Sequence, residues 1–135
     1  MRSIFSQNSK SMKGPINILK AVRSFRYAGV GIYNLFRYEN NARIHLLACI
    51  LVVIAGVFFK ISATEWSLII IQIGLVWAAE AVNTAIEKLA DVVSPEYHPG
   101  IKVVKDTAAA AVLLLAIAAV IVGGIIFIPK ILLFF

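Results

Sequence analysis

The chain has 135 residues, of which 61% are hydrophobic, and it carries a formal net charge of +6 at pH 7. Its mean hydropathy of +0.90 excludes a water-soluble domain, since such domains are only about 45–50% apolar, and it predicts one integral membrane domain over residues 1–135. No nucleic-acid partner is expected, because no base-reading module is visible and membrane topology explains basic residues between apolar segments.

The N-terminal part is polar and basic. Residues 1–14 are rich in Ser, Lys and Arg and are followed by Pro15, which predicts a flexible tail. Residues 16–33 then place apolar side chains on one arc, with Lys20 and Arg23 across from them. This pattern predicts an amphipathic helix on the membrane surface, with its basic side toward the lipid headgroups.

Three long apolar segments follow. Together with their flanking residues they predict transmembrane helices at about 38–59, 65–93 and 106–128. A short turn at 60–65 joins the first two helices, and a polar loop at 96–105 joins the last two. Pro129 is expected to end the third helix.

The distribution of lysine and arginine predicts the topology. Most of these residues precede the first apolar segment or lie between the second and the third. By the positive-inside rule, a multi-pass protein results whose N-terminus and second loop are cytoplasmic and whose C-terminus is outside. Among the acidic residues, only Glu65 then falls on the outer side.

The stretch EAVNTAIEKLAD at residues 80–91 places acidic residues at the end of the second span. At about 100° per residue, Glu80, Glu87 and Asp91 lie within about 40° of one another, with Asn83 to one side. Ionisable groups in a spanning segment cost a few kcal/mol to insert and are functional candidates by default. An acidic face on an apolar helix therefore predicts a cation site.

Magnesium typically binds one or two carboxylates together with substrate phosphates and water. Glu39 from one helix and Glu87 from another are suitable ligands. Glu80 lies about 10 Å deeper along the helix axis than Glu87, at the level of a membrane lipid's hydroxyl group. The spacing therefore predicts a metal and nucleotide end near water and a carboxylate base beside a lipid alcohol.

Four sequence features together resemble the small prokaryotic diacylglycerol kinase family, which includes undecaprenol kinases. They are ENNARIH starting at Glu39, EAVNTAIEKLAD starting at Glu80, the loop Glu96-Tyr97-His98, and the pair Lys105-Asp106. The resemblance implies an all-α homotrimer of three-span subunits, each with an N-terminal surface helix, in the bacterial cytoplasmic (inner) membrane. It also implies that ATP and Mg²⁺ are used to phosphorylate a lipid alcohol.

The resemblance carries residue roles with it. Glu80 would be the catalytic base, Glu39 and Glu87 the metal ligands, and Asn83 and Asp91 their supporting residues. Besides the two metal ligands, the implied nucleotide contacts are Lys20, Tyr27, Glu96, Tyr97, His98, Lys105 and Asp106. ENNARIH is closer to the branch that contains undecaprenol kinases, which slightly favours undecaprenol over diacylglycerol as the substrate.

Simpler explanations exist for several of these residues. Glu39 could pair with Arg43 at the helical spacing of four, Asp106 could cap a helix, and His45 is more typical of a packed residue than of a ligand. For the whole protein, the alternatives are a non-enzymatic membrane scaffold whose acids pair with a basic partner, and a small ion-coupled carrier.

Overall fold

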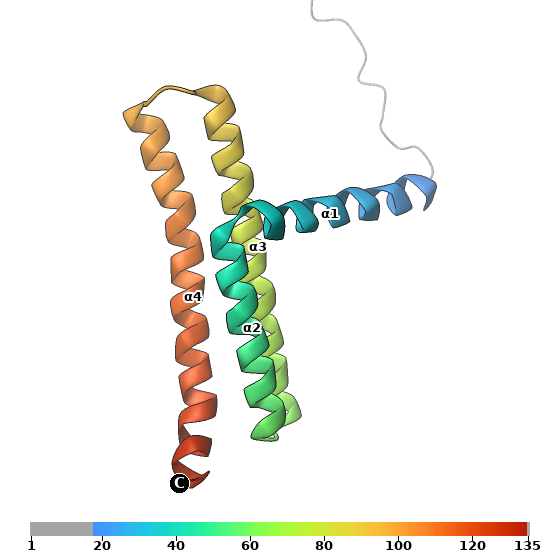
Figure 1. The fold of residues 1–135 in the computed structure, drawn as a ribbon, viewed down its shortest axis with the longest axis vertical. Coiled ribbons are helices and arrows are strands. Elements are labelled where there is room, and N and C mark those ends of the chain that lie inside the picture. The colour runs from blue at the N-terminus through green and yellow to red at the C-terminus, as the bar shows by residue number, and fades with distance from the viewer. Residues whose placement is uncertain (1–17, 135) are drawn as a thin grey trace, which may run out of the picture. The chain divides into compact units, whose positions relative to one another are not determined.

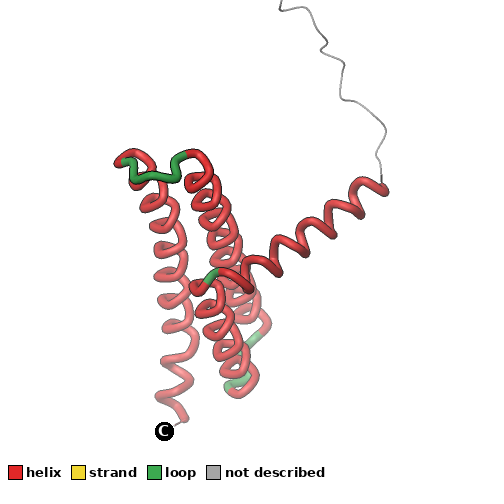
Figure 2. Tube along the Cα trace, turned by 45° about the horizontal axis from the view of Figure 1, so that its top comes forward, coloured by secondary structure: helices red, strands yellow, loops and turns green. Residues whose placement is uncertain are grey.

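The computed structural model describes residues 18–134 and consists of four α-helices (Figure 1). They are α1 (Ile18–Tyr38), α2 (Asn40–Phe58), α3 (Ala63–Val93) and α4 (Pro99–Phe134). Within the described residues no strand occurs, and Figure 2 shows helices joined by short loops. The helices α2, α3 and α4 are each long and apolar enough to cross a membrane. The prediction of an all-helical chain with three candidate membrane spans is therefore confirmed.

The chain divides after Gly31 into two units. The first unit contains the beginning of α1, and the predicted tail at residues 1–14 lies outside the described residues. The second unit begins at Ile32 and contains the end of α1 together with the three long helices. All contacts described below lie within this second unit.

The end of α1 packs against α3, which explains why the helix continues beyond the predicted end at residue 33. Leu35 is buried, and the ring of Phe36 meets that of Trp77 edge-on, with ring centroids 5.2 Å apart. Burial of this kind outweighs the weak helix preference of a polar segment. The chain leaves the helical conformation only at Glu39, and α2 begins one residue later.

The central helix of the second unit is α3, because it packs against both α2 and α4. In Figure 1 these three helices run alongside one another, with the α2–α3 turn at the opposite end from the α3–α4 loop. With 31 residues against 19 in α2, α3 continues well past the level at which α2 begins. Its last turns therefore carry the acidic stretch toward the α3–α4 loop.

The turn between α2 and α3 is closed by a capping box. The Ser62 hydroxyl accepts a hydrogen bond from the backbone N–H of Glu65, and the Glu65 carboxylate accepts one from the N–H of Ser62. This reciprocal pair satisfies two backbone donors at the helix start. It explains why α3 begins at Ala63, slightly before the predicted position at residue 65.

The last helix, α4, is longer at both ends than the predicted span at 106–128. Proline suits its first position, Pro99, because the missing N–H would have no helical partner there. Past Pro129, Lys130 pairs with Glu65 at 3.0 Å, and Phe134 packs against rings of α2 and the α2–α3 turn. These contacts hold the residues beyond Pro129 in a helical conformation, as membrane helices allow.

A small hydrophobic core lies at the end of the bundle that contains the α2–α3 turn. It is formed by the buried residues Ile61, Ile69 and Ile126 and their partly buried neighbours Val52, Phe59, Trp66, Ile73, Val122 and Phe127. Gly56 packs against this core, and a Cβ atom there would come within 2.8 Å of the Trp66 indole. The glycine therefore allows the close approach of α2 and α3.

We expect Gly56→Ala to lower thermal stability in detergent micelles, because overfilling a packed site costs about 1–3 kcal/mol. The matched control is Gly74→Ala, since a Cβ at Gly74 meets no atom within 4 Å. Both changes gain the same helix preference of about 1 kcal/mol, so the difference in melting temperature isolates the clash. Equal melting temperatures for the two variants would contradict this packing.

Candidate active site

The acidic face of α3 is buried at Glu80 and Asn83, whose exposed fractions are 2% and 5%. Nδ2 of Asn83 donates a hydrogen bond to Oε1 of Glu87 at 3.2 Å. Oε2 of Glu80 and Oδ1 of Asn83 have no hydrogen-bond partner among the described residues. Because a buried, unpartnered oxygen is costly, these two acceptors are the places where a donor or a cation would stabilise the site most.

Glu39 stands between α1 and α2 and reaches across to α3. Its backbone is extended and its side chain does not cap α2. Its carboxylate lies 3.1 Å from Nζ of Lys88. The alternative pairing with Arg43 is not formed, because the Arg43 guanidinium instead donates to the carbonyl oxygens of Phe36 and Arg37 at the end of α1.

Residues from α2 and α3 gather around Glu80. Its carboxylate lies within electrostatic range of Glu39, Glu87 and His45. The three acidic residues predicted to form the metal and base positions are therefore neighbours. Asp91 is not among these neighbours and lies closer to the α3–α4 loop.

Lys88 and His45 belong to this neighbourhood, although the sequence does not single out either as a site residue. For Lys88 a sequence signal exists, since it directly follows Glu87 and a nearby positive charge favours the ionised form of clustered carboxylates. For His45 the only signal is its position as a polar residue at the start of an apolar run. In the structure it is half-buried and lies near Glu80.

A second group of predicted residues surrounds the α3–α4 loop, at the end of the bundle opposite the hydrophobic core. A pocket of about 340 Å³ lies there, lined by Asp91, Ser94, Pro95, Glu96, Tyr97, His98, Ile101, Lys102, Lys105 and Asp106. Apart from the metal ligand Glu87, all nucleotide contacts predicted for the C-terminal half of the chain are in this set. The loop pocket is thus the place where the structure brings them together.

Two ion pairs are formed by residues that line the loop pocket. Nζ of Lys105 lies 3.0 Å from Oδ1 of Asp91, which joins α4 to α3, and Lys102 pairs with Asp106 one turn further along α4. Lys105 also lies within electrostatic range of Glu87, so the loop pocket adjoins the acidic face. The explanation of Asp106 as a helix cap is wrong, because α4 already begins at Pro99.

His98 occupies the capping position at the start of α4. Its carbonyl oxygen accepts the hydrogen bond from the Lys102 N–H at 3.0 Å, and its Nδ1 accepts from the Gly100 N–H at 3.1 Å. A neutral imidazole that accepts at Nδ1 carries its proton on Nε2. His98 therefore offers an N–H donor at the loop pocket while its other nitrogen holds the helix start.

Lys20 and Tyr27 lie in the first unit, whereas the other predicted site residues lie in the second. Both are on α1 and are exposed within that unit. Their predicted contact with the nucleotide therefore stays a prediction.

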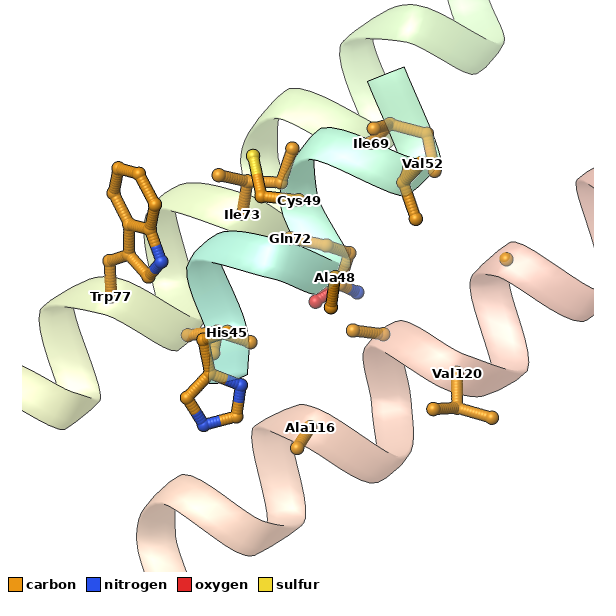
Figure 3. Close-up of a pocket in the computed structure, with 13 residues that line it drawn as sticks. His45, Ala48, Cys49, Val52, Ile69, Gln72, Ile73, Trp77, Ala116 and Val120 are labelled. Carbon is orange, nitrogen blue, oxygen red and sulfur yellow. The ribbon is translucent and has the colours of Figure 1, made fainter. Parts of the chain in front are cut away.

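An apolar groove lies between α2, α3 and α4, with a volume of about 330 Å³ (Figure 3). Its lining consists of His45, Ala48, Cys49, Val52, Ile69, Gln72, Ile73, Val76, Trp77, Ala116, Ala119, Val120 and Gly123. His45 links the groove to the neighbourhood of Glu80. The groove therefore continues from the acidic face along the apolar part of the bundle.

The residues present fit a magnesium ion that is shared with a substrate. The described residues contain no group of three or more acidic, histidine or cysteine side chains that could hold a metal by themselves. Mg²⁺ does not require one, because it keeps several waters and binds one or two carboxylates plus phosphate oxygens. The carboxylates of Glu39, which directly precedes α2, and of Glu87 on α3 are donors of that kind.

Comparison with known proteins finds a matching family and similar kinases. The family model for prokaryotic diacylglycerol kinases matches residues 26–127. An undecaprenol kinase of Bacillus subtilis is 37% identical over 124 residues, covering 92% of this chain and 99% of that protein. A diacylglycerol kinase of Synechocystis is 41% identical over 110 residues, covering 81% of this chain and 63% of that protein.

The role of the His98 side chain as the N-terminal cap of α4 can be tested by substitution. We expect His98→Ala to destabilise the start of α4 by about 1 kcal/mol, as the loss of an N-terminal cap does. His98→Asn should retain most of the stability, because asparagine caps helices well. The measurement is thermal unfolding in micelles, and equal destabilisation by both variants would show that the imidazole does not act as a cap.

Proposed function

The chain belongs to the prokaryotic diacylglycerol kinase family, and from this membership we propose its reaction and site in detail. The family identifies it as a lipid kinase, with ATP as the phosphate donor. We propose that it phosphorylates the primary hydroxyl of undecaprenol or diacylglycerol at the cytoplasmic membrane interface. The reaction is proposed to require Mg²⁺.

The observation that supports this proposal most is the burial of Glu80 beside other carboxylates. A carboxylate with an unpartnered oxygen in the apolar part of a spanning helix is poorly explained by stability, because its insertion costs free energy. It is well explained as a proton acceptor for a hydroxyl group that arrives from the membrane. The nearby Glu39 and Glu87 supply the negative charge expected beside a metal–nucleotide complex.

In the proposed mechanism, Glu80 accepts the hydroxyl proton of the lipid alcohol as that oxygen attacks the γ-phosphorus of ATP. The bond from the γ-phosphorus to the bridging oxygen of ADP breaks, giving lipid phosphate and ADP. Asn83 orients Glu87 through its hydrogen bond. The protein's contribution is mainly positioning and charge compensation, as in other phosphoryl transfers.

Glu39 and Glu87 would hold the magnesium ion. When bound, the ion would supply positive charge that offsets the negative charge developing on the phosphate during transfer. The loop pocket would hold the rest of the nucleotide. There, Lys105 and Lys102 offer ammonium groups to phosphates, and His98 offers its Nε2–H, while Glu96 and Asp106 offer acceptors to the ribose and base.

The apolar groove supports a substrate with a long hydrocarbon tail. Its aliphatic lining extends away from His45 and Glu80, so a lipid whose hydroxyl reaches Glu80 could lay its chain along it. The match over nearly the whole length of the Bacillus subtilis undecaprenol kinase favours undecaprenol. Diacylglycerol remains the second candidate because of the similarity to the Synechocystis enzyme.

We further propose that the protein is a homotrimer in the bacterial inner membrane with its N-terminus in the cytoplasm. Apolar side chains are exposed along all three spans, including Leu47, Ile71 and Leu114, and would be covered by lipid or neighbouring subunits. The first residues of α1, among them Leu19 and Phe25, are likewise exposed, which supports a helix lying on the membrane surface.

The base is tested by Glu80→Gln. We expect the rate of lipid phosphorylation in mixed micelles with Mg²⁺ and ATP to fall by about 100- to 10,000-fold, the usual contribution of a general base. Glu65→Gln is the matched control, because it removes a carboxylate at the other end of the bundle and glutamine preserves the capping box, although the ion pair with Lys130 is lost. Retained activity in Glu80→Gln would rule out Glu80 as the base.

The substrate is tested by assaying undecaprenol and diacylglycerol side by side at equal mole fraction in the same micelles. We expect a higher kcat/KM for undecaprenol. A higher value for diacylglycerol would reverse the assignment of substrate while leaving the kinase activity in place. Incorporation of phosphate into neither lipid would contradict the proposed function itself.

A further inference from the structure

Lys88 makes an unusual contact for a lysine next to a predicted metal site. It directly follows Glu87 on α3, yet its ammonium group lies 3.1 Å from the carboxylate of Glu39, the other predicted ligand. The Lys88 side chain is 66% exposed, whereas that of Glu39 is only 20% exposed. The pair therefore has one anchored partner, the carboxylate, and one partner that can move into water.

The three neighbouring carboxylates give this contact an electrostatic role. Glu39 and Glu87 each lie within interaction range of the Glu80 charge, and like charges at such a site repel. Lys88 places a positive charge against one of them. Without a divalent cation, its ammonium keeps Glu39 directed toward α3, where the opposite ligand Glu87 stands.

We propose that the Lys88 ammonium group pairs with the Glu39 carboxylate in the metal-free protein, in place of the metal ion. It leaves the carboxylate when a divalent ion binds. This inference rests on the proposed function, because it takes Glu39 and Glu87 as the metal ligands. Lysine suits the role better than arginine, since its ammonium is a point charge on a flexible stem, whereas a guanidinium grips a carboxylate with two parallel hydrogen bonds.

Two consequences follow for the metal-free state. The carboxylate of Glu39 is already held near its position in the loaded site, and the metal must displace an ammonium group to use it. An exposed ion pair changes an equilibrium constant by less than about fivefold. Removing the ammonium should therefore tighten metal binding by a factor of about two to five.

The test is titration of the purified full-length protein with Mn²⁺, followed by electron paramagnetic resonance, without nucleotide or lipid substrate. We expect Lys88→Gln to bind Mn²⁺ about two- to fivefold more tightly than the wild type, and Lys88→Arg to bind it no more tightly than the wild type. The control is Lys60→Gln, which removes the same charge at the other end of the bundle and should leave Mn²⁺ affinity unchanged.

A double-mutant cycle distinguishes displacement of Lys88 from Glu39 from a general effect of the Lys88 charge. In a Glu39→Gln background, Lys88→Gln should bring no further gain, because no carboxylate remains for the ammonium to occupy. An equal gain in both backgrounds would overturn the proposal, since it would mean that Lys88 acts only through its long-range field. It would also be overturned if Lys88→Gln matched the wild type, or if neither bound Mn²⁺.

Thermal unfolding gives a second readout. The metal-free Lys88→Gln protein should melt at a lower temperature than the wild type. Mn²⁺ should raise the melting temperature of the variant by more than it raises that of the wild type. A loss of stability that Mn²⁺ does not reverse would indicate a purely structural ion pair and would overturn the proposal. Lipid phosphorylation by the wild type in the same preparation tests the proposed function separately, so the two failures are distinguishable.

Discussion

The burial of Glu80 is the constraint on which the rest of the structure depends. A carboxylate in an apolar helix needs polar neighbours. Glu87 on α3 is one, and Glu39 and His45 are brought to Glu80 by the packing of the start of α2 against α3. The end of α1 secures this arrangement through Leu35 and the contact of Phe36 with Trp77. Glu39, between α1 and α2, is thereby carried to α3 and lies near Glu80.

The architecture can be predicted from the sequence, because the length of an apolar segment is a strong indication of a membrane-spanning helix. The three spans lie close to their predicted positions, and the ends of the helices account for the differences. The capping pattern at Ser62 is present in the sequence and explains the start of α3. The extension of α4 past Pro129 depends on Lys130 meeting Glu65, a contact between residues far apart in the chain that periodicity cannot reveal.

In the candidate site, too, some neighbours can be predicted from helical spacing and others depend on tertiary packing. Helical spacing alone places Glu80, Asn83 and Glu87 on one face, and the structure has them near one another on α3. Spacing also puts Asp91 on that face, yet Asp91 turns to Lys105 and the loop, because its environment is set by where α4 returns. Lys88 and His45 join the acidic residues through tertiary packing, which no local pattern encodes. The roles of all these residues remain predictions.

Different interactions stabilise the two ends of the bundle: apolar packing at one end and ion pairs at the other. At the α2–α3 turn, aliphatic and aromatic side chains interlock around Ile69 and Ile126. At the α3–α4 loop, the junction between α3 and α4 includes the contact of Asp91 with Lys105, both partners of which reach water. Loosening the second end breaks charge pairs but uncovers little apolar surface, so it is the less costly local opening. If the loop pocket binds the nucleotide as proposed, local opening at this end would let the nucleotide enter and leave, while the hydrophobic core at the other end keeps the three helices together.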